Sequence, residues 1–349
     1  MSYGVIPMPD EGNNVQGILY GRKWKICIYK PSYTTNENGE KVRDEDNDTE
    51  MDVSLLRCLF KTSYSMETPA SQIGTLIVYN MNAATEKATI EEGFQIRVEG
   101  GYEQGQYGHI FTGDIIQVIR NREDGIDYRL EILAIRGVNT FDTNYSRATL
   151  AAQSTPRERV EAVCKSADVK IPVGNISENL PDQPLPRGKV IFGTPGKYLR
   201  DIAIANNAHF GLNEEDKAEM KCITDEIPKD SVLYLKPTTG LVGTPRYTDN
   251  GIQIKMLLEP RIRIECLVKI DNELIQRQMV SVSNTKQGPK VNGVNQNLQF
   301  EKSGEYRVLS YAHSMDTWGD DWTTEVVALS QNGRAGLATM MQTKSQNVM

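Results

Sequence analysis

The stretch GIQIKMLLEPRIRIECLVKI, residues 251–270, indicates the fold of this chain more clearly than any other part of it. Apolar and polar residues alternate along its first half, which places Ile252, Ile254 and Met256 on one face of a strand. Pro260 has no N–H to donate to a β-ladder, so it interrupts the strand. The segments RIRI and LVKI that follow predict two more strands. The stretch therefore predicts an antiparallel sheet with one buried face.

Turn and strand signals continue on both sides of this stretch. Asp249 and Asn250 precede Gly251, and all three residue types tolerate a positive φ, so the chain can reverse there between two strands. A short helix is expected at 82–90, with Asn82 as its cap. Further strands are predicted at 24–29, 55–64, 74–79, 94–99, 109–120, 127–136, 274–283, 305–313 and 322–329.

Residues 150–235 differ in composition from the segments on either side. Thr155-Pro156-Arg157-Glu158 combines a capping box with proline at the first helical position, and Thr194-Pro195 starts a second helix. A hairpin is expected between residues 209 and 223. The sequence thus predicts a β-rich α+β fold in five parts. They are an N-terminal arm (1–22), a first β region (23–149), a small α+β insert (150–235), a second β region (236–330) and a C-terminal tail (331–349).

Composition limits the classes of function. At 349 residues the chain is long for one hydrophobic core, so two to four domains are expected. The five cysteines are odd in number and form no C-x-x-C pair, which favours buried thiols in a reduced compartment over disulfides or zinc. A net charge of −7 argues against a nucleic-acid backbone as the main ligand. No apolar run reaches the roughly 18 residues of a membrane span, so no membrane insertion is expected.

The residues that could support chemistry form no recognisable signature. His313, with Asp316 and Asp320, is the one cluster that mixes a base with acids. It could act as a general base or a metal pair, or it could be a strand-end histidine hydrogen-bonded across a turn. The alternating acids between Asp44 and Glu50 lack the glycine and the final acid of a calcium loop. We therefore predict no catalytic, metal-binding or cofactor-binding residues and no enzyme activity.

Three blocks resemble the baseplate hub proteins of contractile-tailed bacteriophages, the late-control or tail-hub proteins of Mu-like phages. The first begins at Leu76 and includes V-E-G-G-Y and I-F-T-G-D; the second is the central stretch with G-T-P, D-N-G-I and L-L-x-P. The third is H-S-M-D-T-W-G-D-D-W at 313–322, where Met315 and Trp318 depart from the family pattern, as does Glu265-Cys266. The matching positions are Gly93, Gly101, Tyr102, Gly113, Gly243, Pro245, Gly251, Pro260, His313, Asp316, Thr317, Gly319 and Trp322.

The resemblance implies a structural role for these residues and for the protein. Family members form a homotrimer in which each chain contributes two similar antiparallel β-barrels, here 23–149 and 236–330. Three chains then present six similar units, which lets a trimeric spike meet a hexameric tail tube. The implied location is the tail baseplate of a virion, assembled in the host cytoplasm.

The same resemblance implies the partners: the tail tube protein, the central spike protein, the tape measure protein and inner baseplate or wedge proteins. DNA would cross the lumen without specific binding, and we expect acids to outnumber bases on the lumen wall. Two alternatives remain open from the sequence. One is an OB-like module that binds oligosaccharide or nucleic acid, and the other is a tail-associated cell-wall hydrolase.

Overall fold

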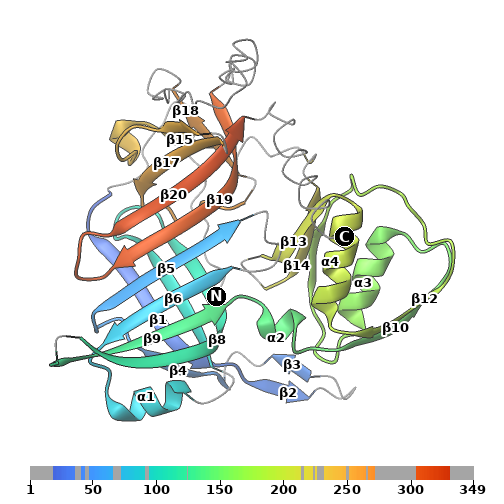
Figure 1. The fold of residues 1–349 in the computed structure, drawn as a ribbon, viewed down its shortest axis with the longest axis horizontal. Coiled ribbons are helices and arrows are strands. Elements are labelled where there is room, and N and C mark those ends of the chain that lie inside the picture. The colour runs from blue at the N-terminus through green and yellow to red at the C-terminus, as the bar shows by residue number, and fades with distance from the viewer. Residues whose placement is uncertain are drawn as a thin grey trace, which may run out of the picture.

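The dominant feature of the structure, a computed structural model, is a 13-stranded sheet that contains strands of both β regions (Figure 1). The structure describes residues 19–35, 41–43, 47–65, 72–90, 94–123, 125–213, 216–222, 225, 232–248, 251–264, 266–271 and 304–330. The expected strand at 274–283, most of the arm and the tail 331–349 lie outside these ranges, as do Gly93, Asp249 and Asn250. In the described residues, none of the helices is long and apolar enough to cross a membrane.

The first β region supplies seven strands to this sheet. They are β1 (Arg22–Lys30), β4 (Thr49–Asp52), β5 (Cys58–Ser65), β6 (Ile73–Tyr79), β7 (Gln95–Tyr102), β8 (Tyr107–Glu123) and β9 (Asp127–Ile135). Two short strands, β2 (Tyr33–Thr35) and β3 (Lys41–Arg43), pair separately. Helix α1 (Ala83–Ile90) joins β6 to β7, and the Asn82 Oδ1 accepts a hydrogen bond from the Thr85 N–H at 2.8 Å. The expected helix and its cap are therefore confirmed.

The other six strands come from the second β region together with β15, which lies at the end of the predicted insert (150–235) but pairs with the main sheet. They are β15 (Val232–Leu235), β16 (Arg246–Thr248), β17 (Gly251–Leu257), β18 (Leu267–Ile270), β19 (Glu305–Asp316) and β20 (Trp322–Ser330). The short 3-10 helix η3 (Pro237–Thr239) follows β15. Along the sheet the order is β16-β17-β20-β19-β5-β6-β9-β8-β7-β1-β4, with β18 paired to β19 and β15 paired to β18. Figure 1 shows this order running downwards from β17 to β8.

The insert forms its own unit beside the sheet. Helices α3 (Pro156–Lys165) and α4 (Pro195–Ala205) pack on two small sheets, which consist of β10 (Ser146–Leu150) with β12 (Lys189–Gly193) and of β11 (Val173–Ile176), β14 (Ala218–Cys222) and β13 (Ala208–Leu212). The Thr155 hydroxyl accepts from the Glu158 N–H, and the Thr155 N–H donates to the Glu158 carboxylate. The predicted capping box is thus confirmed. The separate core of this unit includes Phe141 of the short helix α2 (Val138–Phe141).

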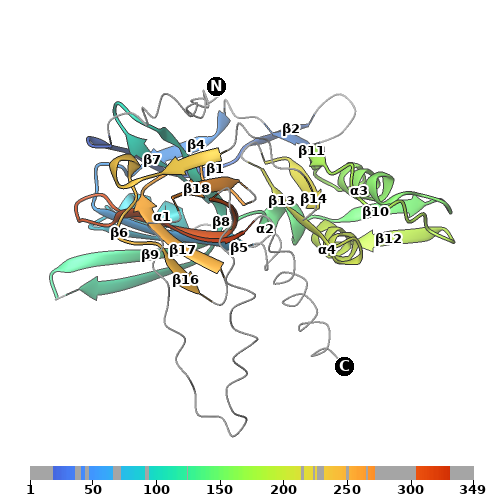
Figure 2. The same ribbon diagram turned by 90° about the horizontal axis from the view of Figure 1, so that it is seen from above.

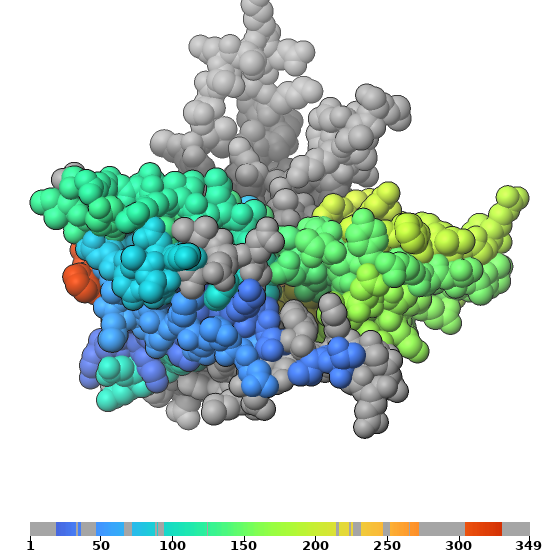
Figure 3. Space-filling view, turned by 90° about the horizontal axis from the view of Figure 1, so that it is seen from below, coloured from blue at the N-terminus to red at the C-terminus, as the bar shows by residue number. Residues whose placement is uncertain are grey.

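The insert is attached to the sheet by a few polar contacts. The Tyr64 hydroxyl lies 2.8 Å from Nε2 of His209, and Arg136 bonds the carbonyl of Asn213 and the carboxylate of Asp216. Figures 2 and 3 show the insert, in green and yellow-green, projecting to one side of the strands. The main sheet therefore keeps edges that the insert does not cover.

Directly paired residues on neighbouring strands share a face, so the ladders sort the sheet into two surfaces. Phe60, Leu76 and Ile132 are paired across β5, β6 and β9 and are fully buried. The adjacent row, Lys61, Thr75 and Leu133, lies on the opposite face, which is open to solvent. The sheet thus has one core face and one exposed face, as the alternation of residues predicts.

The two β regions repeat the same strand order. In the first region the order is β1-β7-β8-β9-β6-β5, and in the second it is β15-β18-β19-β20-β17-β16. Strands that match in chain order (β1 with β15, β5 with β16, β6 with β17, β7 with β18, β8 with β19 and β9 with β20) occupy the same places in the two halves of the sheet. The neighbours also run in the same relative direction, except that β1 and β7 are antiparallel while β15 and β18 are parallel.

Irregularities in the ladders repeat as well. The β8–β9 ladder shifts between Ile115 and Gln117, and the β19–β20 ladder shifts between Val308 and Ser310. Just before the shift, the Ile115 N–H donates to the carbonyl of Phe94, and the Val308 N–H donates to the carbonyl of Cys266. Because a bulge fixes the register, these matches align the two regions residue by residue.

Two expectations need correction. Residues 261–264 form turns instead of a strand, because their arginines bond to a neighbouring carboxylate and to backbone carbonyls. The family resemblance also implies two tube-like barrel domains. In the described residues the strands instead form one sheet that does not close into two barrels, because the β19–β5 ladder joins the second region directly to the first.

Candidate assembly site

The turn from β19 to β20 is built around one carboxylate. Oδ1 of Asp316 accepts hydrogen bonds from the N–H groups of Trp318, at 2.9 Å, and Gly319, at 2.8 Å. Burial alone would raise the pKa of Asp316, but these two donors and the Arg57 guanidinium, 3.4 Å from Oδ2, hold that pKa below its usual range. An ionised Asp316 therefore fixes the shape of the turn.

This turn is fastened to the first β region. The Thr317 N–H donates to the carbonyl of Cys58 at 3.0 Å, and its hydroxyl oxygen accepts from the Cys58 N–H at 2.9 Å. Arg22 of β1 donates to the carbonyl of Gly319 at 2.5 Å and lies 5.4 Å from the centre of the Trp322 ring. Residues of the third family-like block thus bond to strands that lie more than 250 positions earlier in the chain.

Apolar side chains complete the same joint. Leu258, Met315 and Trp322 come from the second region but belong to the buried cluster of the first. Gly100 permits the approach, since a Cβ there would lie 2.7 Å from the terminal methyl of Met315. The rings of Trp24 and Trp322 meet edge to face at 5.9 Å. The two regions therefore share a core at this point.

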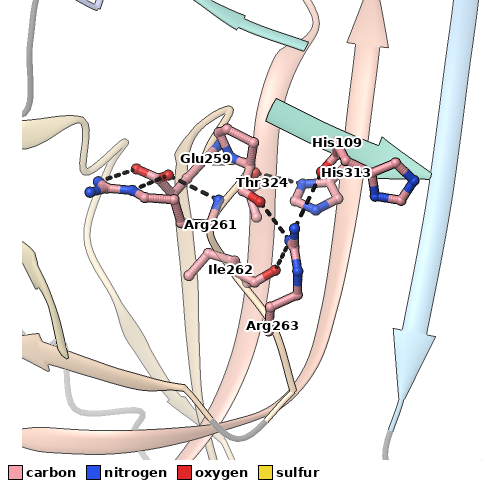
Figure 4. A network of polar contacts seen from close by, with 8 residues as sticks. His109, Glu259, Arg261, Ile262, Arg263, His313 and Thr324 are labelled. Carbon is pink, nitrogen blue, oxygen red and sulfur yellow. Dashed lines mark hydrogen bonds and ion pairs between the residues drawn. The ribbon is translucent and has the colours of Figure 1, made fainter. Parts of the chain in front are cut away.

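A buried ion pair holds the connection from β17 to β18 (Figure 4). Nε and Nη2 of Arg261 bond to the two carboxylate oxygens of Glu259 at 2.8 and 2.9 Å. Arg263 donates to the carbonyls of Pro260 and Ile262 at 2.5 and 2.8 Å, and to that of His109 in β8 at 3.4 Å. These charge-assisted hydrogen bonds hold the turn in shape, and the bond from Arg263 to His109 connects it to the first region.

His313 lies within this network and not beside the acids of the turn. Its Nδ1 is 2.8 Å from the Thr324 hydroxyl, which also accepts from the Glu259 N–H at 3.0 Å. Burial, with a smaller effect from Arg263, lowers the pKa of His313 to about 3. Asp316 follows three positions later in the same strand, so its side chain points to the opposite face. The structure thus separates His313 from Asp316, and its environment suits a neutral, hydrogen-bonded histidine.

The remaining family-like positions are distributed over both regions. Gly101 has a φ of +151°, and a Cβ there would lie 2.0 Å from the carbonyl oxygen of Gln106, so only glycine fits this turn. Tyr102 is buried beside it. Gly113 lies in β8, Gly251 begins β17, Gly243 and Pro245 lie between η3 and β16, and Pro260 follows β17. These positions shape turns and strand ends and do not converge on one pocket.

Sequence reasoning missed the partners of the motif. Arg22 and Arg57 fasten the β19–β20 turn to the first region, but each is an ordinary charged residue in the sequence, more than 250 positions from the residue it bonds. The one local signal was Glu259 and Arg261, an acid and a base two positions apart that form an ion pair. Within the described ranges, no group of His, Cys, Asp and Glu residues could hold a metal ion, and all five cysteines are buried free thiols.

Comparison with solved structures finds tail proteins. A 43 kDa tail protein of prophage MuSo2 from Shewanella oneidensis is 10% identical, with a TM-score of 0.53 over 89% of this chain and 99% of that chain. Tail proteins share this fold. A tail protein from Neisseria meningitidis MC58 is 9% identical, with a TM-score of 0.50 over 90% of this chain and 99% of that chain. No protein-family model and no curated protein sequence matches the chain.

Proposed function

We propose that this protein is a structural hub of a contractile phage tail. In the proposal it forms a homotrimer with pseudo-six-fold symmetry, joins the hexameric tail tube to the trimeric spike, and surrounds part of the DNA channel. It acts in the baseplate of the virion and has no catalytic role. Its further partners are the tape measure protein and inner baseplate or wedge proteins.

The repeated strand order carries this proposal. Three identical chains can meet a six-fold tube only if each chain presents two equivalent surfaces. Residues 22–135 and 232–330 each contribute six strands that correspond in order, with a bulge and a backbone hydrogen bond at corresponding places. The fold shared with tail proteins supports the same setting.

The exposed face of the sheet is the surface we assign to the lumen. Its ion pairs include Arg129 with Glu131 at 2.9 Å and Lys255 with Glu325 at 3.0 Å. On β5, β6, β9, β16, β17, β20 and the 116–123 half of β8, the charged residues on this face that are not buried are Lys61, Arg129, Arg246 and Lys255, and Glu123, Asp127, Glu131 and Glu325. Four bases and four acids do not give the excess of acids that we expected. Balanced charge still leaves no strong attraction for phosphates.

The mass in solution tests the proposal. Multi-angle light scattering during gel filtration is expected to give three times 39.1 kDa, with the mass constant over a tenfold dilution of an obligate trimer. Negative-stain images of the same fraction are expected to show rings with six similar lobes. A monomer at all concentrations, or a ring with an even number of chains, would contradict the hub.

A further inference from the structure

One long edge of the sheet has no partner in the described residues. β8 is 17 residues long, yet it pairs with β7 only from Tyr107 to Asp114. From Ile116 to Glu123 it pairs with β9 on one side, and no strand in the described part of the chain pairs with its other side. The corresponding half of β19, Ser310 to Asp316, is paired there with β5. Within the chain, β19 therefore has a neighbouring strand along this half, whereas the corresponding half of β8 lacks one in the described residues.

The same half of β8 also exposes apolar side chains. Four of the exposed large apolar residues lie on the β8–β9 hairpin: Ile116 (49% exposed), Ile119 (40%), Ile126 (83%) and Tyr128 (37%). In Figure 2 this hairpin projects from the body of the protein. A long apolar edge is a site of strand addition unless something covers it.

The complementary edge lies at the other end of the sheet. β16 is the counterpart of β5, and in the described ranges it pairs with β17 alone. Inside the chain, β5 covers the β19 half that corresponds to the open half of β8. A second copy of the chain, which brings its own β16, thus has the strand that β8 lacks.

We infer that the 116–123 half of β8 in one copy pairs antiparallel with β16 of the next copy, in the register of the internal β19–β5 ladder. The inference rests on the proposed trimer and adds the surface that closes it. Head-to-tail pairing of this kind joins unlike edges, so it forms a ring when the rotation closes. Three internal β19–β5 ladders and three ladders between copies then alternate around that ring.

The repeat fixes the register. The bulges align Ser314 with Asn121, and the β5–β6 and β16–β17 ladders align Lys61 with Arg246. Since Ser314 is paired with Lys61, Asn121 of one copy faces Arg246 of the next. By the same step, Arg120 faces Tyr247 and Ile119 faces Thr248.

The equivalence also explains the exposed tyrosine. Tyr128 corresponds to Trp322, which is buried in the core of the first region. In the ring, Tyr128 packs into the second region of the adjoining copy, just as Trp322 packs into the first region of its own chain.

Disulfide trapping tests the pairing. Directly opposite residues in an antiparallel ladder have Cα atoms about 4.5–5.5 Å apart, within the range for a disulfide, whereas diagonal neighbours are about 7–8 Å apart. Asn121→Cys with Arg246→Cys is therefore expected to give covalently linked trimers after mild oxidation. The matched pair Glu123→Cys with Arg246→Cys places the second thiol on the diagonal and is expected to give about tenfold less product.

All three substituted positions are exposed and the native thiols are all buried, so each single variant serves as a background control. Light scattering of the reduced double variant reports the assembly independently of the link. A linked trimer supports the pairing. A trimer in which the direct pair links no better than the diagonal pair overturns the pairing but leaves the hub. A monomer overturns both.

Discussion

At the scale of single residues, the joint depends on Asp316 and on the absence of a side chain at Gly319. The carboxylate accepts two backbone hydrogen bonds only because the turn passes close to it. A Cβ on Gly319 would lie 2.3 Å from Asp316 Oδ2 and 2.7 Å from Cγ. The glycine is therefore required by proximity and not by a positive φ.

Gly319→Ala is expected to lower the free energy of unfolding by about 1–3 kcal/mol, because the carboxylate must move away from its donors. Urea denaturation followed by circular dichroism measures the change. Gly108→Ala is the matched control, since its Cβ would meet Pro260 at an ordinary 3.6 Å. Equal destabilisation by the two substitutions would contradict this account of the turn.

His313 predicts how stability depends on pH. Burial lowers its pKa to about 3 from an ordinary value near 6.5, so the folded state disfavours the protonated ring. The stabilising effect is fully present above pH 6.5 and is lost as the pH falls towards 3, because the unfolded chain takes up the proton first. Burial and neighbouring arginines also lower the pKa of His109, which acts in the same direction.

The free energy of unfolding is therefore expected to fall between pH 7 and pH 5, by at most about 1.4 kcal/mol per pH unit for each histidine. Urea titrations at several pH values measure this slope. His313→Gln removes the titrating group, so its slope should be shallower even if its stability at pH 7 is lower. An unchanged slope would show that His313 is protonated equally in both states.

At the scale of elements, the β19–β20 turn fastens the second region to the first. Trp322 begins β20 and has only 1% of its surface exposed, whereas Trp318, four positions earlier in the turn, is 72% exposed. The same residue type thus occurs in two opposite environments within one connection. This contrast allows the contribution of the joint to be measured.

Trp322→Ala is expected to destabilise the fold by about 3–5 kcal/mol, because the cavity would open at the core shared by the two regions. Trp318→Ala deletes the same side chain at a solvent-exposed position, so it should change the free energy of unfolding by no more than about 0.5 kcal/mol. Denaturant unfolding of both variants makes the comparison. Similar losses for the two would mean that the joint contributes little.

Local signals account for the elements that sequence reasoning predicted. The capping box at Thr155, the cap at Asn82 and the alternation along β17 and β19 all act within a few residues, and each is present in the structure. Residues 261–264 misled because RIRI alternates like a strand, while the arginines bond to Glu259 and to carbonyls instead. Such partners cannot be found from periodicity alone.

At the scale of the whole molecule, periodicity indicates two β regions around an insert, but only the family resemblance implied that they repeat, and neither gave the strand-by-strand correspondence. Corresponding positions carry different side chains, such as His313 and Arg120, or Trp322 and Tyr128. What repeats is the order of strands, one bulge and one backbone hydrogen bond, none of which needs a particular residue. The shared core at the joint was equally hidden, since it depends on residues far apart in the chain.

The repeat fails at its first strand, because β15 runs parallel to β18 while β1 runs antiparallel to β7 and carries β4 on its outer side. This difference determines how many copies of a partner protein can bind to the proposed ring. A binding protein that recognises the common strands has six places per ring, whereas one that recognises β1 or β15 has three. One gene product could thereby offer two stoichiometries at once, sixfold towards one neighbour and threefold towards another.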